Sequence, residues 1–196
     1  MSTLASTHTK TNTGIYHGKL GMWVFLASEI MFFTGFFGAF IVLRNLNIEV
    51  FTASAHQLDK VVATINTAVL ITSSLTMALS HLALERGNEA KFRLFLTITI
   101  ICAFGFLGIK TYEYASKFSH DIYPWTNNFF ATYFTMTGFH ALHVIGGLIP
   151  MIWMLGKSMV KGYPQSMHHR VETLGLYWHF VDLVWIFLFP TLYLIF

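Results

Sequence analysis

The sequence contains little charge. Only 11% of its 196 residues are Asp, Glu, Lys or Arg, whereas an ordinary soluble domain has about 25%. A hydrophobic fraction of 55% and a mean hydropathy of +0.57 agree with this shortage. Since the surface of a soluble domain needs more charge than this chain has, a soluble enzyme and a disordered chain are both disfavoured.

Cysteine is almost absent as well. Cys102 is the single cysteine of the sequence, so an internal disulfide and a cysteine-rich metal site are excluded. It lies in an apolar run, where a small buried thiol is the expected state. The basic residues are scattered along the chain and form no stripe, so the formal net charge of +3 does not indicate a nucleic-acid partner.

Long apolar runs are what the sequence has instead. A helix needs about 20 mostly apolar residues to cross the hydrocarbon core of a bilayer. The runs are continuous rather than alternating, which favours helices over strands, and a barrel needs many more segments. The sequence therefore predicts an all-α integral membrane domain over residues 19–196, a bundle whose five transmembrane helices lie at about 20–44, 62–84, 92–114, 129–155 and 173–196.

The distribution of Lys and Arg predicts the orientation, since these residues are enriched in cytoplasmic segments. Eight lie in the N-terminal tail and in the second and fourth links, and four lie on the other side. The N-terminus is therefore expected in the cytoplasm and the C-terminus outside. Residues 1–18 are rich in Ser and Thr and are expected to form a mobile cytoplasmic tail, with no cleavable signal peptide before the first span.

Small residues predict where the helices approach each other. The second span carries a ridge in which each member follows the last by four residues: Thr64, Ala68, Thr72, Thr76 and Ser80. Gly35 and Ala39 on the first span, and Gly146 and Gly147 on the fourth, are expected to allow the same close packing. In lipid, such packing replaces the hydrophobic drive between helices.

Ionisable residues within the spans are the candidate functional residues, because each costs about 2.5–3.5 kcal/mol to insert unless it has a partner or a role. Five lie near the middle of their spans and predict one buried polar network: Glu29, His140, His143, His179 and Asp182. His81 and Glu113 lie nearer to span ends and are expected at the membrane interface. Glu29 is expected to approach a polar group of the fourth or fifth span, with His143 and Asp182 as the candidates.

Spacing alone leaves three interpretations of this network. The His and carboxylate groups could pair and hold the helices together, they could relay protons or serve quinone chemistry, or two histidines could bind a haem or a metal. The metal interpretation is weaker, since no Glu-x-x-His pair faces another and no carboxylate or cysteine cluster completes a coordination shell.

Several motifs, in order along the chain, resemble subunit III of the haem-copper terminal oxidases. Ser28 and Glu29, followed by MFFTGFF at 31–37, are similar to the family's first large signature. The other matching segments are NTAVL at 66–70, Glu113-Tyr114, TGFHALHV at 137–144 and WHFVDLVW at 178–185. The resemblance covers about residues 19–196 and therefore includes all five predicted helices.

This resemblance implies a supporting subunit with no catalytic residue and no metal of its own. The haems and copper would lie in partner subunits, subunit I being the main partner and subunit II another. The implied role is to stabilise the catalytic subunit, hold phospholipid and help proton uptake in a proton-pumping oxidase. Glu29 matches the family's buried acidic residue.

Longer family members begin with two further helices, so this chain is similar to the short five-helix members. That form suggests the plasma membrane of a bacterium. Two other functions stay open from the residues alone. One is a stand-alone membrane cytochrome that uses His140 or His143 with His179, and the other is a small transporter.

Overall fold

A computed structural model describes residues 17–161 and 168–194, and within these ranges the chain is helical and contains no strand. Most of the predicted N-terminal tail, 1–18, lies outside the described residues. The elements are α1 (His17–Leu46), α2 (Ile48–Ala55), α3 (Lys60–Glu85), α4 (Glu89–Ser119), α5 (Asn128–Lys161), α6 (His168–Phe189) and a π-helical turn, η2 (Pro190–Leu194).

Within the described residues, five of the six α-helices are long and apolar enough to cross a membrane, namely α1, α3, α4, α5 and α6. Helices α1, α3, α4 and α5 cover the apolar runs predicted there and extend beyond them at both ends, whereas α6 begins before the predicted fifth run and ends at Phe189, where η2 follows. Helix α4, for example, continues to Ser119, whereas the third predicted span ends at 114. Hydropathy detects only the part of a helix that lies in hydrocarbon, whereas backbone hydrogen bonding continues through the polar residues that follow.

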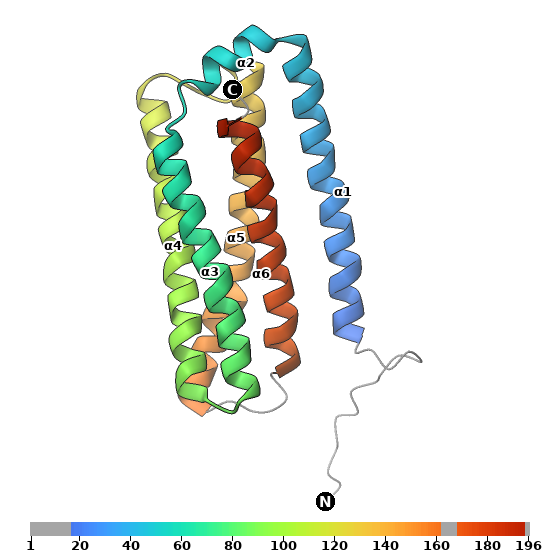
Figure 1. The fold of residues 1–196 in the computed structure, drawn as a ribbon, viewed down its shortest axis with the longest axis vertical. Helices are drawn as coiled ribbons and strands as arrows, with labels where there is room; N and C mark the ends of the chain where they lie inside the picture. Colours follow the sequence, from blue (N-terminus) through green and yellow to red (C-terminus); the bar gives the residue numbers. More distant parts are fainter. Residues whose placement is uncertain (1–16, 162–167, 195–196) are drawn as a thin grey trace, which may run out of the picture.

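The long helices run side by side, with α2 across one end (Figure 1). We call this the upper end; the lower end holds the start of α1, the turn between α3 and α4, and the start of α6. Helices α3 to α6 form a four-helix bundle in which each helix packs against two neighbours. Helix α1 packs on the edge formed by α5 and α6, so it is the most peripheral of the five.

Local capping fixes the ends of α3 and the start of α4. The Asp59 carboxylate accepts hydrogen bonds from the backbone N–H groups of Val61 and Val62, and the Asn88 side chain accepts one from Lys91. Between them, Gly87 adopts a left-handed conformation (φ 70°). The Asn88 N–H bonds the Ala83 carbonyl and the Gly87 N–H bonds the Leu84 carbonyl, at 2.9 Å each. This is a Schellman motif, and it folds α4 directly back against α3.

The bundle core contains two tryptophans of α6 whose indole N–H groups are both satisfied. Trp178 donates to the Ser73 hydroxyl at 3.1 Å, and Trp185 donates to the Thr67 hydroxyl at 3.0 Å. Both indoles are almost completely buried. Because hydrocarbon offers no hydrogen-bond partner, the hydroxyls of α3 replace the water that an indole would otherwise require.

Small residues allow close contact at some of the predicted positions. A Cβ atom at Gly147 would lie 2.8 Å from the ring of Trp178, so the absence of a side chain lets α5 and α6 approach. At Gly35 nothing lies within 4 Å of that position, and the close contact expected there is not found.

The ridge of small residues on α3 divides into two parts. Thr76 and Ser80 are buried and bond α4, through the Thr99 hydroxyl at 2.8 Å and the Phe92 carbonyl at 3.3 Å. Thr64, Ala68 and Thr72 are exposed. The ridge was expected to form one continuous contact, but it follows a spacing of four residues, which drifts around a helix of 3.6 residues per turn and leaves the interface.

We expect Gly147→Ala to lower the free energy of unfolding by about 1–3 kcal/mol, since the added methyl group would overlap the buried Trp178 ring. Gly156→Ala is the matched control, because nothing lies within 4 Å of its Cβ position. The measurement is the thermal unfolding midpoint of the purified protein in lipid nanodiscs. Equal midpoints for the two variants would contradict the close approach of α5 and α6.

Candidate functional site: polar contacts inside the helical bundle

The polar residues of the first and fourth predicted spans meet between α1 and α5. Glu29 Oε2 lies 2.8 Å from His143 Nε2, which is one of the two contacts suggested for Glu29 by the sequence. The other ring nitrogen of His143 lies 2.7 Å from the Phe139 carbonyl. Since that carbonyl only accepts, Nδ1 carries a proton. The glutamate and histidine side chains are 17% and 16% exposed, so the pair is largely shielded.

A second polar contact ties α1 to α6 at the lower end. Lys19 Nζ donates to Glu172 Oε1 at 2.6 Å, with the two side chains 39% and 35% exposed. The Phe33 ring packs on His143 with a centroid separation of 5.3 Å. The peripheral helix α1 is therefore held by two polar contacts at different depths and by aromatic packing beside the Glu29–His143 pair.

The other three residues of the predicted network lie in the four-helix bundle. His179 Nδ1 lies 2.7 Å from the Ser74 hydroxyl. His140 is fully buried, between the rings of Phe106 and Trp185. Neither His140 nor Asp182 makes a side-chain hydrogen bond within the described part of the chain. The hydrogen bonds of Glu29 and His143 do not extend to these three residues.

The most heavily bonded cluster lies in the upper half of the bundle, and sequence reasoning did not predict it. Lys110 Nζ donates to Glu113 Oε2 at 2.9 Å and to the hydroxyls of Tyr133 and Tyr193 at 3.2 and 3.0 Å. Both tyrosines donate to Glu113 Oε1 at 2.8 Å. Lys110 and Glu113 are 4% and 6% exposed. The cluster thereby connects α4, α5 and η2.

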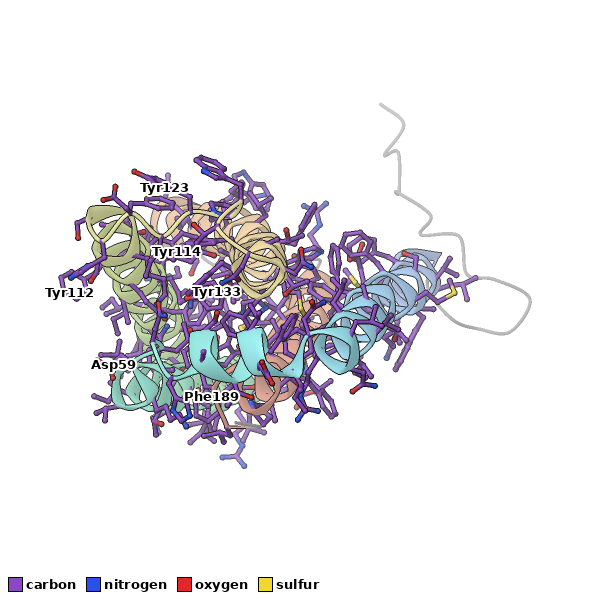
Figure 2. All side chains as sticks on the ribbon, turned by 90° about the horizontal axis from the view of Figure 1, so that it is seen from above. Asp59, Tyr112, Tyr114, Tyr123, Tyr133 and Phe189 are labelled. Atoms are coloured by element: carbon purple, nitrogen blue, oxygen red, sulfur yellow. The ribbon has the colours of Figure 1, made fainter. Side chains whose placement is uncertain are left out.

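Helix position explains this burial. Glu113 lies six residues before the end of α4 and faces the bundle, whereas the sequence suggested a position at the membrane interface. Tyr112, next to it, is 71% exposed and lies on the outer side of α4, while Tyr133 lies near the middle of the bundle (Figure 2). The spacing of Lys110 and Glu113, three residues apart on one helix face, was the signal that could have revealed the pair.

His81 lies near the lower end of α3, where the sequence suggested an interfacial position. Its Nε2 atom is 3.4 Å from Glu85 Oε1, one turn further along the helix, and the histidine side chain is 31% exposed. This pair does not join the contacts of the bundle interior.

The donor groups do not form a metal site in the part of the chain that the structure describes. No three or more His, Cys, Asp or Glu side chains gather closely enough there to hold a metal ion. His140 packs against aromatic rings, and His143 and His179 bond other side chains. These contacts join helices, which is the arrangement expected of a polytopic helical membrane subunit.

Comparison with known proteins gives the family. The sequence profile of cytochrome c oxidase subunit III matches residues 1–195. The chain is 35% identical to cytochrome c oxidase subunit 3 of Thermostichus vulcanus over 178 residues, 90% of this chain and 86% of that protein. It is 33% identical to the Synechocystis sp. protein of the same name, over 99% and 84% of the two chains, and 32% identical to that of Bacillus subtilis, over 89% and 84%. The chain belongs to the cytochrome c oxidase subunit III family, and is thus a subunit III of a haem-copper oxidase.

We expect Lys110→Met to lower the free energy of unfolding by about 3–5 kcal/mol, because it leaves the Glu113 carboxylate buried without its cation. The double variant Lys110→Met/Glu113→Gln should lose clearly less, since no unpaired charge remains. Lys19→Met is the matched control: its ion pair is partly exposed and should contribute less than about 1 kcal/mol.

These three variants are to be compared by thermal unfolding in lipid nanodiscs. Equal losses for Lys110→Met and Lys19→Met, or a double variant that is the least stable of all, would contradict the assignment of Lys110 and Glu113 as a buried ion pair.

Proposed function

We propose that this chain is the non-redox subunit of a proton-pumping oxidase and supports a catalytic subunit I. The haems and copper would lie in partner subunits, with subunit II as a further partner. The complex would reduce oxygen to water with electrons from cytochrome c or a quinol. The observation that carries this proposal is the use of the ionisable groups: Glu29, His143 and Lys110 all engage side chains of other helices.

The outward faces of the long helices support a role in a membrane complex. Large apolar side chains are exposed on every one of them, for example Trp23, Ile71, Ile101, Ile149 and Phe187. Apolar exposure of this extent fits lipid or partner helices. Partners of the chain would be the other oxidase subunits and membrane lipids.

The positions of the basic residues favour an orientation with the lower end in the cytoplasm. Of the four cations counted on the opposite side, Lys110 and Lys117 are buried inside the bundle, at 4% and 7% exposure. The bias of accessible Lys and Arg towards the lower end is therefore stronger than the sequence alone indicated. A multi-pass protein of a bacterial plasma membrane is the localisation that fits this bias and the bacterial relatives.

A phospholipid headgroup would fit a groove of about 510 Å³ at the lower end, between α1, α5 and α6. Lys19 and Arg170 line this groove together with Trp153. The Lys157 ammonium and the Arg170 guanidinium lie 4.8 and 5.9 Å from the Trp153 ring centre. Cations beside an interfacial tryptophan favour an anionic headgroup.

The Glu29–His143 pair would combine two roles. It holds α1 against α5, and it places an acid and a base in hydrogen-bond contact inside the protein, where a proton can be held. The remaining members of the predicted network, His140, His179 and Asp182, would act within the bundle as structural or proton-linked groups.

In the assembled oxidase, we expect Glu29→Gln to lower the number of protons translocated per electron while changing stability by less than about 1 kcal/mol, because the amide still bonds His143. Glu29→Leu should additionally cost about 1–3 kcal/mol, since the Nε2 atom of His143 then lacks a partner. Glu172→Gln serves as the control at the surface. An unchanged proton stoichiometry in Glu29→Gln would leave Glu29 with a structural role only.

The absence of a redox centre is tested by the absorption spectrum. When the complex is purified through a tag on this chain, we expect a haem spectrum; when the chain is separated from its partners, we expect no Soret band. A Soret band at stoichiometric level in the separated chain would favour the stand-alone cytochrome. Substrate flux through liposomes that contain this chain alone would favour the transporter.

A further inference from the structure

The turn between α3 and α4 forms one wall of a pocket of about 390 Å³ at the lower end of the bundle. This pocket lies on the α3–α4 hairpin, whereas the groove described above lies between α1, α5 and α6. The polarity of its lining decreases along the helix axis, away from the turn. Arg86, Asn88 and Lys91 lie at the turn, and Leu82, Leu94 and Phe95 lie deeper along the two helices.

The two cations of this pocket have no acidic partner in the described part of the chain. The nearest acidic residues in sequence contact other groups: Glu85 lies 3.4 Å from His81, and Glu89 lies 2.8 Å from Arg93. Arg86 and Lys91 are both exposed. The turn therefore presents two unpaired positive charges, and the positive end of the α4 dipole adds to their field.

The apolar part of the pocket is open on the outside of the bundle. Leu82 and Leu94 are 38% and 56% exposed. Leu94 follows Lys91 by three residues, which places it about 4.5 Å deeper along the helix axis. Positive charge at the helix ends with an open apolar wall beneath it matches a phospholipid, in which an anionic headgroup lies above acyl chains.

We propose that this pocket binds one anionic phospholipid. The headgroup phosphate lies between Arg86 and Lys91, and an acyl chain lies along Leu82, Leu94 and Phe95. An anionic lipid is favoured over a zwitterionic one because the latter carries its own ammonium group, which opposes the two cations. The Schellman motif at Gly87 fixes the backbone of the turn from which both cations project.

The experiment uses the full-length chain, purified with the subunits that accompany it and placed in phosphatidylcholine nanodiscs. A minor fraction of phosphatidylglycerol carries a photoreactive diazirine on its acyl chain, and cross-linked peptides are mapped by mass spectrometry. We expect labelling within residues 79–95, and much weaker labelling there by a phosphatidylcholine probe of the same design.

Removal of the cations should weaken labelling by about fivefold for each residue changed, as in Arg86→Gln and Arg86→Gln/Lys91→Gln. The exchange Arg86→Lys/Lys91→Arg keeps both charges and should retain most of the labelling. Lys157→Gln/Arg170→Gln is the matched control, since it removes one cation that lines the other groove and one that lies beside its Trp153, and should leave the labelling of residues 79–95 unchanged.

Three results would overturn the proposal: no labelling of residues 79–95, equal labelling by the two lipid probes, or a double Gln variant labelled like the native chain. The proposal is independent of the role of the chain in the oxidase. Native haem content and proton pumping can therefore coexist with failure at this pocket.

Discussion

Hydrocarbon cannot donate or accept a hydrogen bond, and this constraint explains the pairing of most of the ionisable groups described above, His140 and Asp182 excepted. Lys110 and Glu113 satisfy each other and two tyrosine hydroxyls, and His143 satisfies Glu29. In each case the partner belongs to a neighbouring helix or completes a contact with one. Because these buried groups are stable only when they are bonded, they determine which helix faces pair. Apolar packing alone gives little of this specificity in lipid.

The constraint acts with different strength in different parts of the fold. Helices α3 to α6 share a tightly packed interior in which indoles bond hydroxyls and Gly147 admits the Trp178 ring. Helix α1 packs on the outside of this bundle through the Glu29–His143 and Lys19–Glu172 contacts and through aromatic packing such as that of Phe33 on His143. A peripheral helix that is attached by a few polar contacts can respond to a partner subunit more readily than the four helices of the bundle.

The sequence predicts the helices well and their contacts only in part. Apolar runs of about 20 residues have one stable form in a bilayer, so the class and the five long helices could be read directly. The Glu29–His143 contact was one of two candidates, since His143 and Asp182 both matched Glu29 in depth. The family followed from motifs such as TGFHALHV, which are specific only when several occur in order.

The rest depended on information that a linear pattern does not contain. Lys110 was counted among the outer charges although it lies within the predicted span 92–114, and in the structure α4 continues to Ser119 and Lys110 is buried in the bundle. Tyr133 and Tyr193 are 60 residues apart, and nothing local predicts that both face one ammonium group. Gly35 and Gly147 look alike in the sequence, but only Gly147 faces another helix closely.

The π-helical turn at 190–194 has a geometric consequence for the end of the chain. A regular α-helix turns by about 100° per residue, so Tyr193 would project about 80° away from the direction of Trp185. The wider turn that begins at Pro190 reduces this angular offset, and both rings lie beside the Lys110 ammonium, at 5.2 and 5.6 Å from their centres. The irregular backbone thus brings Tyr193 towards the side of the last helix that carries Trp185, so that both rings contact the same ammonium group.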